Sequence, residues 1–231
     1  MRLTRKKPQL IFKLATGLCA FTLLGPVTAL AADGLSYSYL QVGYVNLNID
    51  EVGDSGSLLD DIDNGGGWAA SGSFAISPNW FAFTQYSVTD SDVSFTDDQS
   101  LYFNSNTDIN RLDLGFGFHS AMSKTTDLVF RIAYTDVDTD GFNFGGSSDT
   151  SLNDLNDDSS DGYFVDAAIR SQFTERMEGS LGLRYTDLEH IDNLSLIANV
   201  MHEFTPKVGL NFSLEAGNDI SSFLIGLRYS F

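Results

Sequence analysis

The last ten residues constrain the fold of this chain more than any other stretch. From Ser222 to Phe231, every second residue is large and apolar, and most of the residues between them are small or polar. A period of two places these two kinds of side chain on opposite faces of an extended strand. A strand that separates lipid from a polar lumen has this pattern. The apolar positions are Phe223, Ile225, Leu227, Tyr229 and Phe231.

The first 31 residues have the organisation of a secretory signal peptide. A basic region at residues 1–7 precedes an apolar run at about 14–30, and small residues mark a cleavage site at Ala31. The alternative is an uncleaved anchor helix, but the run is short and Pro26 interrupts it. Cleavage after Ala31 leaves residues 32–231, a length that suits one domain.

Charge and composition exclude several classes of protein. The signal peptide carries five of the 13 basic residues and none of the 31 acidic ones, so the mature net charge is −23. Such a chain repels nucleic acid. The single cysteine, Cys19, lies in the signal peptide, which leaves no thiol for a disulfide or a metal site. No mature stretch approaches the length of a transmembrane helix, and the abundant aromatic residues argue against a disordered acidic chain.

Ten segments of the mature chain have the length and alternation of membrane-crossing strands. Two of them are blurred. The first is consistent with a β-bulge, and in the third Phe81 and Phe83 favour one face whereas Tyr86 and Val88 favour the other. The segments are approximately 35–48, 66–77, 80–90, 108–120, 126–136, 161–173, 177–189, 193–204, 207–217 and 221–231.

The connections between these segments divide into long and short ones. The three long connections, at about 49–65, 91–107 and 137–160, all fall on the same side of the predicted sheet, and the opposite side has only short turns. Outer-membrane barrels have this asymmetry, with short periplasmic turns and longer external loops. The sequence therefore predicts an all-β fold, a transmembrane antiparallel up-and-down barrel of ten strands, with eight strands as the alternative.

Charged residues within the strands share the face opposite the apolar residues. A charge that faced hydrocarbon would be costly, so we expect these groups to point into the lumen and to pair there. In a barrel this small, interior side chains nearly fill the space, which favours a structural plug over an open channel. The predicted lumen charge network is Arg111, Asp113, Arg131, Asp166, Arg170, Glu178, Arg184, Glu203, Glu215 and Arg228.

Aromatic residues gather at both ends of the predicted strands. Aromatic girdles at the two membrane interfaces account for them without a ligand-binding role. The external set is Trp68, Tyr134, Tyr163 and Tyr185, and the periplasmic set is Trp80, Phe118, Phe173, Phe204, Tyr229 and Phe231.

Both ends of the mature chain resemble known proteins. The ending Ile225–Phe231 is similar to the C-terminal signal for barrel insertion, with Leu227, Tyr229 and Phe231 at its alternate positions, and Leu35–Tyr44 resembles the start of small Gram-negative outer-membrane β-barrel proteins of the OmpA-barrel and OmpX type. The resemblance implies export through the periplasm to the outer membrane, as a free-standing monomer. It also implies contact with outer-membrane lipid and lipopolysaccharide, and with periplasmic chaperones and the insertion machinery during biogenesis.

Three histidines are candidates for catalysis. His190 lies at a predicted external turn beside acidic residues, where an Asp–His pair could activate water, as it does in outer-membrane proteases with ten strands. Those enzymes need a second carboxylate pair and longer strands above the membrane, and neither is evident here. His119 and His202 lie near the periplasmic end on opposite faces, and neither gathers a Ser and an acid. The sequence therefore predicts that the protein is not an enzyme.

One acidic segment imitates the start of a calcium-binding loop. Asp136, Asp138 and Asp140 alternate and are followed by Gly141, but an EF-hand loop requires a Glu where this chain has Ser147, and requires flanking helices. We therefore expect no cofactor and acidic loops that their charge keeps solvated, with loose binding of calcium or magnesium by these loops as the alternative.

The sequence leaves three functions open. It favours a non-enzymatic barrel whose acidic external loops mediate surface interaction or envelope stability. The alternatives are a narrow, porin-like channel that prefers cations because of its acidic rim, and a rim hydrolase centred on His190.

Overall fold

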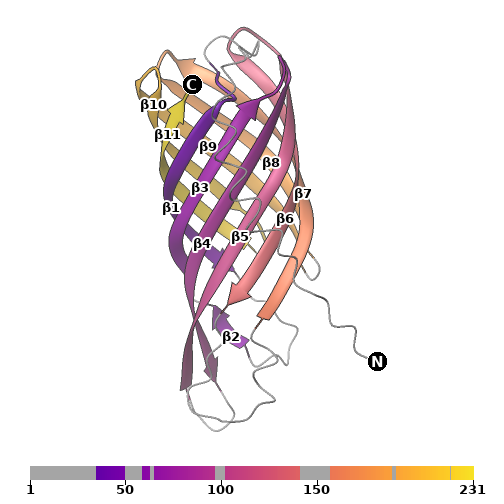
Figure 1. Cartoon of the computed structure of the whole chain (residues 1–231), viewed down its shortest axis with the longest axis vertical. Helices are drawn as coiled ribbons and strands as arrows, with labels where there is room; N and C mark the ends of the chain where they lie inside the picture. Colours follow the sequence, from indigo (N-terminus) through magenta and orange to yellow (C-terminus); the bar gives the residue numbers. More distant parts are fainter. Residues whose placement is uncertain are drawn as a thin grey trace.

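A closed ring of antiparallel strands forms the body of the molecule (Figure 1). The computed structural model describes residues 35–49, 59–62, 65–96, 102–140, 157–188, 191–218 and 220–231. The strands of the ring are β1 (Tyr39–Ile49), β3 (Gly65–Ala75), β4 (Trp80–Thr96), β5 (Tyr102–Ala121), β6 (Thr126–Asp140), β7 (Asp157–Thr174), β8 (Met177–Leu188), β9 (Ile191–Thr205), β10 (Val208–Ala216) and β11 (Ile220–Ser230).

Each strand of the ring pairs with its neighbours along the chain, and β1 pairs with β11 to close the barrel. The predicted ten-stranded up-and-down barrel is confirmed, and the alternative of eight strands is wrong. The C-terminus lies at the end of the barrel that carries the short turns (Figure 1). In the described part of the chain, no helix is long and apolar enough to cross a membrane.

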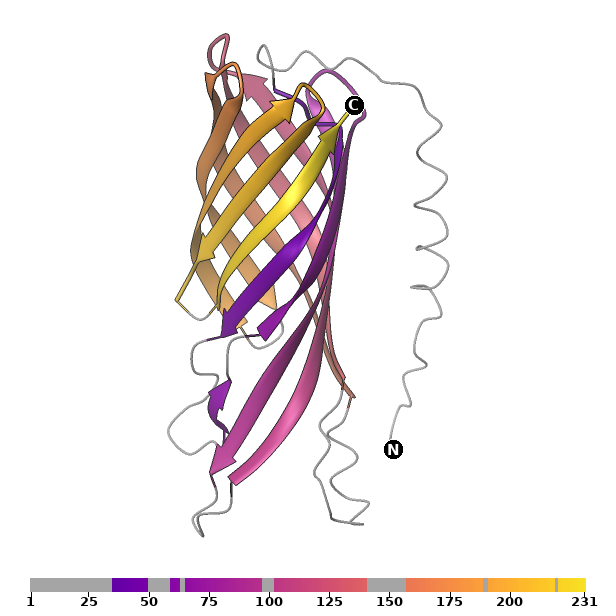
Figure 2. The same ribbon diagram turned by 90° about the vertical axis from the view of Figure 1, so that its left-hand side faces the viewer.

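Several strands extend further at the external end than predicted. β4, β5, β6 and β7 continue beyond the expected bounds, and a short strand, β2 (Leu59–Ile62), pairs with the external part of β4 outside the ring. Figure 2 shows β4 and β5 reaching well past the rest of the barrel. Beyond the membrane neither face of a strand meets lipid, so the alternating apolar pattern ends although backbone pairing continues.

The start of the first predicted strand is not part of the sheet. Residues 35–38 precede β1, and Leu35 and Tyr37 are buried with Phe81 at the periplasmic end of the lumen. The bulge expected in β1 is also absent, because its register with β3 and β11 is continuous. The pattern there is blurred because Val45 faces inward and packs with Leu224 in a small apolar cluster inside the barrel.

The outer surface of the barrel is apolar between two aromatic belts. Trp68, Tyr134, Tyr163 and Tyr185 are exposed at the external side, while Trp80, Phe173, Phe204, Tyr229 and Phe231 are exposed at the periplasmic side. Phe118 is half-buried against the ring of Trp80. Exposed Leu, Ile, Val and Phe side chains lie between the belts. This arrangement is typical of a barrel that spans a bilayer.

Candidate functional site

Charged side chains from several strands meet in the lumen. A first cluster joins three strands through one shared carboxylate, that of Asp166. Arg131 Nε donates to its Oδ1 at 2.9 Å, and Arg184 Nη2 donates to its Oδ2 at 3.0 Å. Arg184 Nη1 also donates to Glu215 Oε2 at 2.8 Å. The cluster therefore links β6, β7, β8 and β10 across the interior.

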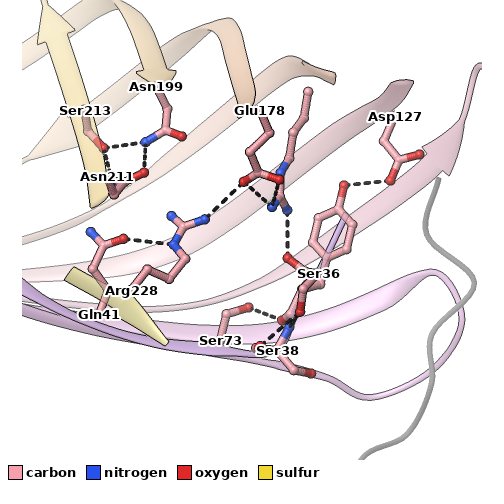
Figure 3. Close-up of polar contacts among 12 residues, drawn as sticks. Ser36, Ser38, Gln41, Ser73, Asp127, Glu178, Asn199, Asn211, Ser213 and Arg228 are labelled. Carbon is pink, nitrogen blue, oxygen red and sulfur yellow. Dashed lines mark hydrogen bonds and ion pairs between the residues drawn. The ribbon is translucent and has the colours of Figure 1, made fainter. Parts of the chain in front are cut away.

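A second cluster is built around Glu178 on β8. Arg170 Nη2 donates to both carboxylate oxygens, at 2.6 and 2.8 Å, and Arg228 Nη1 lies 3.4 Å from Oε1. Arg228 Nε donates to Gln41 Oε1 at 3.0 Å, which ties the last strand to the first (Figure 3). The cluster connects β7 and β8 to the seam where the barrel closes.

Each of these four arginines also lies over an aromatic ring. The guanidinium carbon of Arg184 is 4.1 Å from the ring centroid of Phe164, and that of Arg228 is 4.1 Å from Tyr39. The corresponding pairs Arg170–Tyr37 and Arg131–Phe83 are at 4.8 and 5.7 Å. Such cation–π contacts stabilise partly desolvated cations. The sequence interpretation missed these rings because aromatic residues were assigned to the lipid face.

Two glycines of β5 make room for the interior rings. A Cβ on Gly117 would lie 2.0 Å from the Phe81 ring, and one on Gly115 would lie 2.6 Å from Phe83. The alternation Gly115-Phe116-Gly117-Phe118 therefore signals that the lumen face of β5 accepts large side chains from the neighbouring strand, β4. That signal was available in the sequence.

Three members of the predicted network lie apart from these clusters. Arg111 Nε donates to Asp113 Oδ1 at 3.0 Å, and Asp113 also accepts the Thr135 hydroxyl, so this pair forms a separate contact. Glu203 also lies on the lumen-facing side of its strand, but it has no ion pair among the described residues. Arg170 is engaged elsewhere, because it binds Glu178 and donates to the Ser36 carbonyl oxygen at 3.0 Å.

The segment 35–38 closes the periplasmic mouth of the lumen. The Tyr37 hydroxyl donates to Asp127 Oδ2 at 2.8 Å, the dashed line that ends at Asp127 in Figure 3. The Tyr37 ring stacks on His119, with the ring centroids 3.9 Å apart. Ser73 Oγ donates to the Tyr37 carbonyl oxygen at 2.8 Å. These side chains are buried, so the segment is packed into the barrel and not merely laid across its end.

His119 has a carboxylate neighbour that the sequence interpretation did not foresee. Its Nδ1 lies 3.2 Å from Asp127 Oδ2, on the adjacent strand of the same hairpin. The sequence analysis expected no Ser together with an acid at His119, and it did not foresee this acid, which the turn between β5 and β6 brings close. Among the described residues His119 Nε2 has no hydrogen-bond partner, so no serine completes a triad. His202 is exposed on the outer face, and His190 lies outside the described residues.

The acidic segment proposed as a calcium loop is part of strand β6. Asp136 and Asp138 lie on its outward face, and alternate residues of a strand are about 7 Å apart, which separates their carboxylates. The described residues contain no group of three His, Cys, Asp or Glu side chains placed to hold a metal ion. The side chain of Asp140 and the loop that follows lie outside the described residues.

A cavity of about 190 Å³ remains inside the barrel. Its wall includes Arg131, Arg170, Arg184 and Arg228, together with serine and glutamine side chains. Among the predicted carboxylates of the network, only Glu215 contributes to this wall. The interior thus contains ion pairs around a small space with polar groups in its wall.

The predicted insertion signal lies on the lipid face of the last strand. Leu227, Tyr229 and Phe231 are exposed, whereas Arg228 between them is buried in the lumen. The outward face of β11 is therefore apolar, and Phe231 continues that face just beyond the strand.

Comparisons with known proteins agree with this architecture. A family model described as the outer membrane protein beta-barrel domain matches residues 17–231. No curated protein sequence matches the chain.

Several solved structures are similar in shape. OprG of Pseudomonas aeruginosa is 9% identical, with a TM-score of 0.49, over 87% of this chain and 99% of that one. Ail, the attachment invasion locus protein of Yersinia pestis, is 13% identical, with a TM-score of 0.43, over 84% and 97%. The KdgM porin is 9% identical, with a TM-score of 0.43, over 83% and 99%.

Proposed function

This chain belongs to the outer membrane protein β-barrel domain family and lies in the Gram-negative outer membrane, and on that premise we propose that it is a closed, non-enzymatic barrel acting through its external surface. The observation that carries the proposal is the filled interior. Two ion-pair clusters cross the lumen, and the segment 35–38 occupies its periplasmic mouth.

Planar-bilayer recording tests whether the barrel is closed. Ion flow requires a continuous water path, and the paired arginines and the packed Tyr37 interrupt such a path. We expect no steady conductance from barrels whose insertion is verified by their heat-shifted electrophoretic mobility. A sustained single-channel conductance in the unaltered protein would overturn the proposal.

The external end offers a raised surface for interaction. β4 and β5 remain paired from Asp90↔Asp108 out to Thr96↔Tyr102, whereas the described pairing of β5 with β6 begins only at Asp108. The hairpin therefore extends six residues further than its neighbour, or about 20 Å at the usual rise of a strand. A rigid paired hairpin presents an external surface at a lower ordering cost than a flexible loop.

A complementation experiment separates surface interaction from envelope stability. A strain lacking the protein is tested for sensitivity to detergents and for attachment to surfaces. It is complemented with the full chain or with a barrel whose β4–β5 hairpin is shortened to the level of Asp90 and Asp108. We expect the shortened barrel to restore the envelope but not attachment. If it restores both, the hairpin has no part in the function.

The acidic external loops also support loose binding of calcium or magnesium. Divalent ions would bridge the loops to the anionic sugar surface of lipopolysaccharide, which fits the strongly acidic mature chain. Calorimetric titration of the refolded protein with calcium checks this proposal. The absence of heat at millimolar calcium would contradict it.

A narrow channel is the second candidate function. The acidic loops favour cations at the external rim, but four arginines line the cavity within.

A rim hydrolase is the third candidate and depends on His190. If the parent protein hydrolyses no peptide or ester substrate, or if His190→Ala leaves its turnover unchanged, that candidate is eliminated.

A further inference from the structure

The two lumen clusters contain more cationic than anionic groups. Four arginines, Arg131, Arg170, Arg184 and Arg228, share three carboxylates, those of Asp166, Glu178 and Glu215. Every arginine has a carboxylate partner, but two of the carboxylates are shared, so the clusters carry one net positive charge. A charge away from bulk water is costly unless it is compensated.

The arginines, more than the carboxylates, face the remaining space. The side chain of Arg131 is 28% exposed while its partner Asp166 is fully buried. Arg170 is 12% exposed against 5% for Glu178, and Arg184 is 13% exposed against 0% for Asp166. Asp166 and Glu178 thus lie behind the guanidinium groups, whereas Glu215 is as exposed as Arg184 and shares the cavity wall with the arginines. Four arginines against one carboxylate leave the wall positive.

Other charged groups near the lumen do not reverse this balance at the cavity wall. Asp127 is bound by Tyr37 beside His119, and Asp113 is paired with Arg111. Neither carboxylate lines the cavity, and Glu203 does not line it either. Glu215 is the one acidic side chain in the described lining, and Arg184 and the Ser195 hydroxyl both donate to it.

Donor groups remain for a ligand. The hydrogen bonds described for Arg131, which lines the cavity, use only its Nε and leave its two terminal nitrogens available as donors. Those described for Arg228 use Nε and Nη1. Gln85, Ser180 and Ser222 supply further polar groups to the same wall. A guanidinium group offers paired N–H donors that match a carboxylate or a phosphate.

We propose that this cavity binds a small anion that carries a carboxylate or phosphate group, held chiefly by Arg131 and Arg228. The volume of about 190 Å³ limits the ligand to a single ring or a short chain, because a cavity of roughly 150 Å³ accommodates one benzene molecule. The site does not depend on whether the barrel conducts ions, so it stands apart from the function proposed above.

Calorimetric titration of the refolded full barrel in zwitterionic micelles tests the site. The probes are sodium phosphate and sodium glucuronate, with glucose as an uncharged molecule of the same ring size. Saturable binding of either anion, without binding of glucose, is the expected result. Saturation by phosphate alone assigns the site to phosphate groups, and saturation by glucuronate alone assigns it to carboxylates. The absence of saturation by both anions overturns the proposal.

Two arginine variants distinguish the cavity from general charge attraction. Arg131→Gln should weaken binding about tenfold, because it removes a charged donor, while Asp166 keeps its bonds to Arg184. Arg111→Gln removes an equal charge from the lumen but outside the cavity wall, so binding should be unchanged. Equal weakening in both variants would show nonspecific attraction and refute the site.

A cavity-filling variant covers the case in which Arg131→Gln does not fold. Ser222→Phe places a ring in the space without removing any charge, and Ser222 is half-buried in the wall. It should abolish saturable binding while heat-shifted mobility still reports a folded barrel. Undiminished binding by a folded Ser222→Phe variant would also overturn the proposal.

Discussion

The two faces of the same ten strands obey different rules. On β8 the outward residues Leu181 and Leu183 are more than half exposed. Arg184 on the same strand points inward and contacts two carboxylates, one on β7 and one on β10. The outer face needs only apolar groups, since lipid accepts any of them. The inner face needs particular partners at particular heights, because each buried charge requires compensation. The lipid-facing side thus requires only apolar residues at alternate positions, whereas the lumen-facing side requires specific pairs of opposite charges.

The lumen contacts also join strands that are not neighbours. Arg184 on β8 reaches Glu215 on β10, and Arg228 on β11 reaches Glu178 on β8. The backbone ladder cannot make such links, because it connects only adjacent strands. The inner face therefore fixes the cross-section of the barrel, and the outer face fixes its position in the bilayer.

The largest expected effect follows from removing a shared lumen cation. Arg184→Met leaves Asp166 with Arg131 alone and leaves Glu215 with the Ser195 hydroxyl. Breaking a buried ion pair from one side costs about 3 kcal/mol or more. We expect the urea midpoint of unfolding in phospholipid vesicles to fall accordingly.

Leu183→Met on the outward face of the same strand is the matched control for Arg184→Met. The substitution keeps an apolar side chain toward lipid, so it should change the free energy of unfolding by less than about 1 kcal/mol. Comparable losses in the two variants would contradict the distinction between the faces.

A charge on the lipid face gives the next largest effect. Leu181 is 57% exposed, and along β8 it lies midway between Met177 at the periplasmic end and Tyr185 in the external belt. Leu181→Arg should destabilise the barrel by about 2–4 kcal/mol, the cost of an arginine near the bilayer midplane. The measurement is again urea unfolding in vesicles. Leu181→Phe, which stays apolar, should be close to neutral.

The sequence predicted the outer face well and the inner face only in part. Alternation identified ten strands because lipid imposes the same demand on each, and it placed the charged groups on the inner face. It did not show which carboxylate serves which arginine. That choice depends on register and on strands far apart in sequence, as with Arg228 and Glu178.

The periplasmic mouth was also beyond the sequence pattern. Tyr37 alternates with its neighbours as a strand residue would, so residues 35–38 were expected to belong to the first strand. In the structure Tyr37 is held by Asp127 and stacked on His119, two residues that follow it by more than 80 positions. Such contacts leave no local signature, whereas the lumen position of Phe81 is indicated by its cross-strand partner Gly117.

A smaller effect on the free energy of unfolding is expected when a tyrosine hydroxyl is removed, and it should differ between a buried tyrosine and an exposed one. Tyr37→Phe removes a buried hydrogen bond to a carboxylate, which is worth about 1.5 kcal/mol. Tyr44 is 46% exposed on the outer face, so Tyr44→Phe should change the free energy of unfolding far less. Urea unfolding of the two variants provides the comparison. If both changes are negligible, residues 35–38 do not stabilise the barrel.

The smallest expected effect on stability concerns Asp136, at the level where the outward face of β6 extends beyond the membrane. Asp136 lies on that face two residues beyond Tyr134, and it pairs in register with Asp161 on β7. Burial, and then the charges of Asp138 and Asp161, raise the pKa of Asp136 above its usual value. Outside the bilayer the outer face can therefore carry charges, but crowding them still has a cost.

The sign of the pH dependence follows from that raised pKa. When the pKa of a carboxyl is higher in the folded state than in the unfolded state, folding is disfavoured above both pKa values. The penalty is lost as the pH falls through the folded-state pKa of Asp136. Asp136→Asn should therefore stabilise the protein by roughly 0.5 kcal/mol at neutral pH, as expected for relief of a like-charge cross-strand pair. This advantage over the parent should shrink toward zero in acid, below the unfolded-state pKa.

Asp161→Asn should give a similar gain in stability. The double variant should gain less than the sum of the two single variants, since both changes relieve the same repulsion. Full additivity at neutral pH would show that these two carboxylates do not interact.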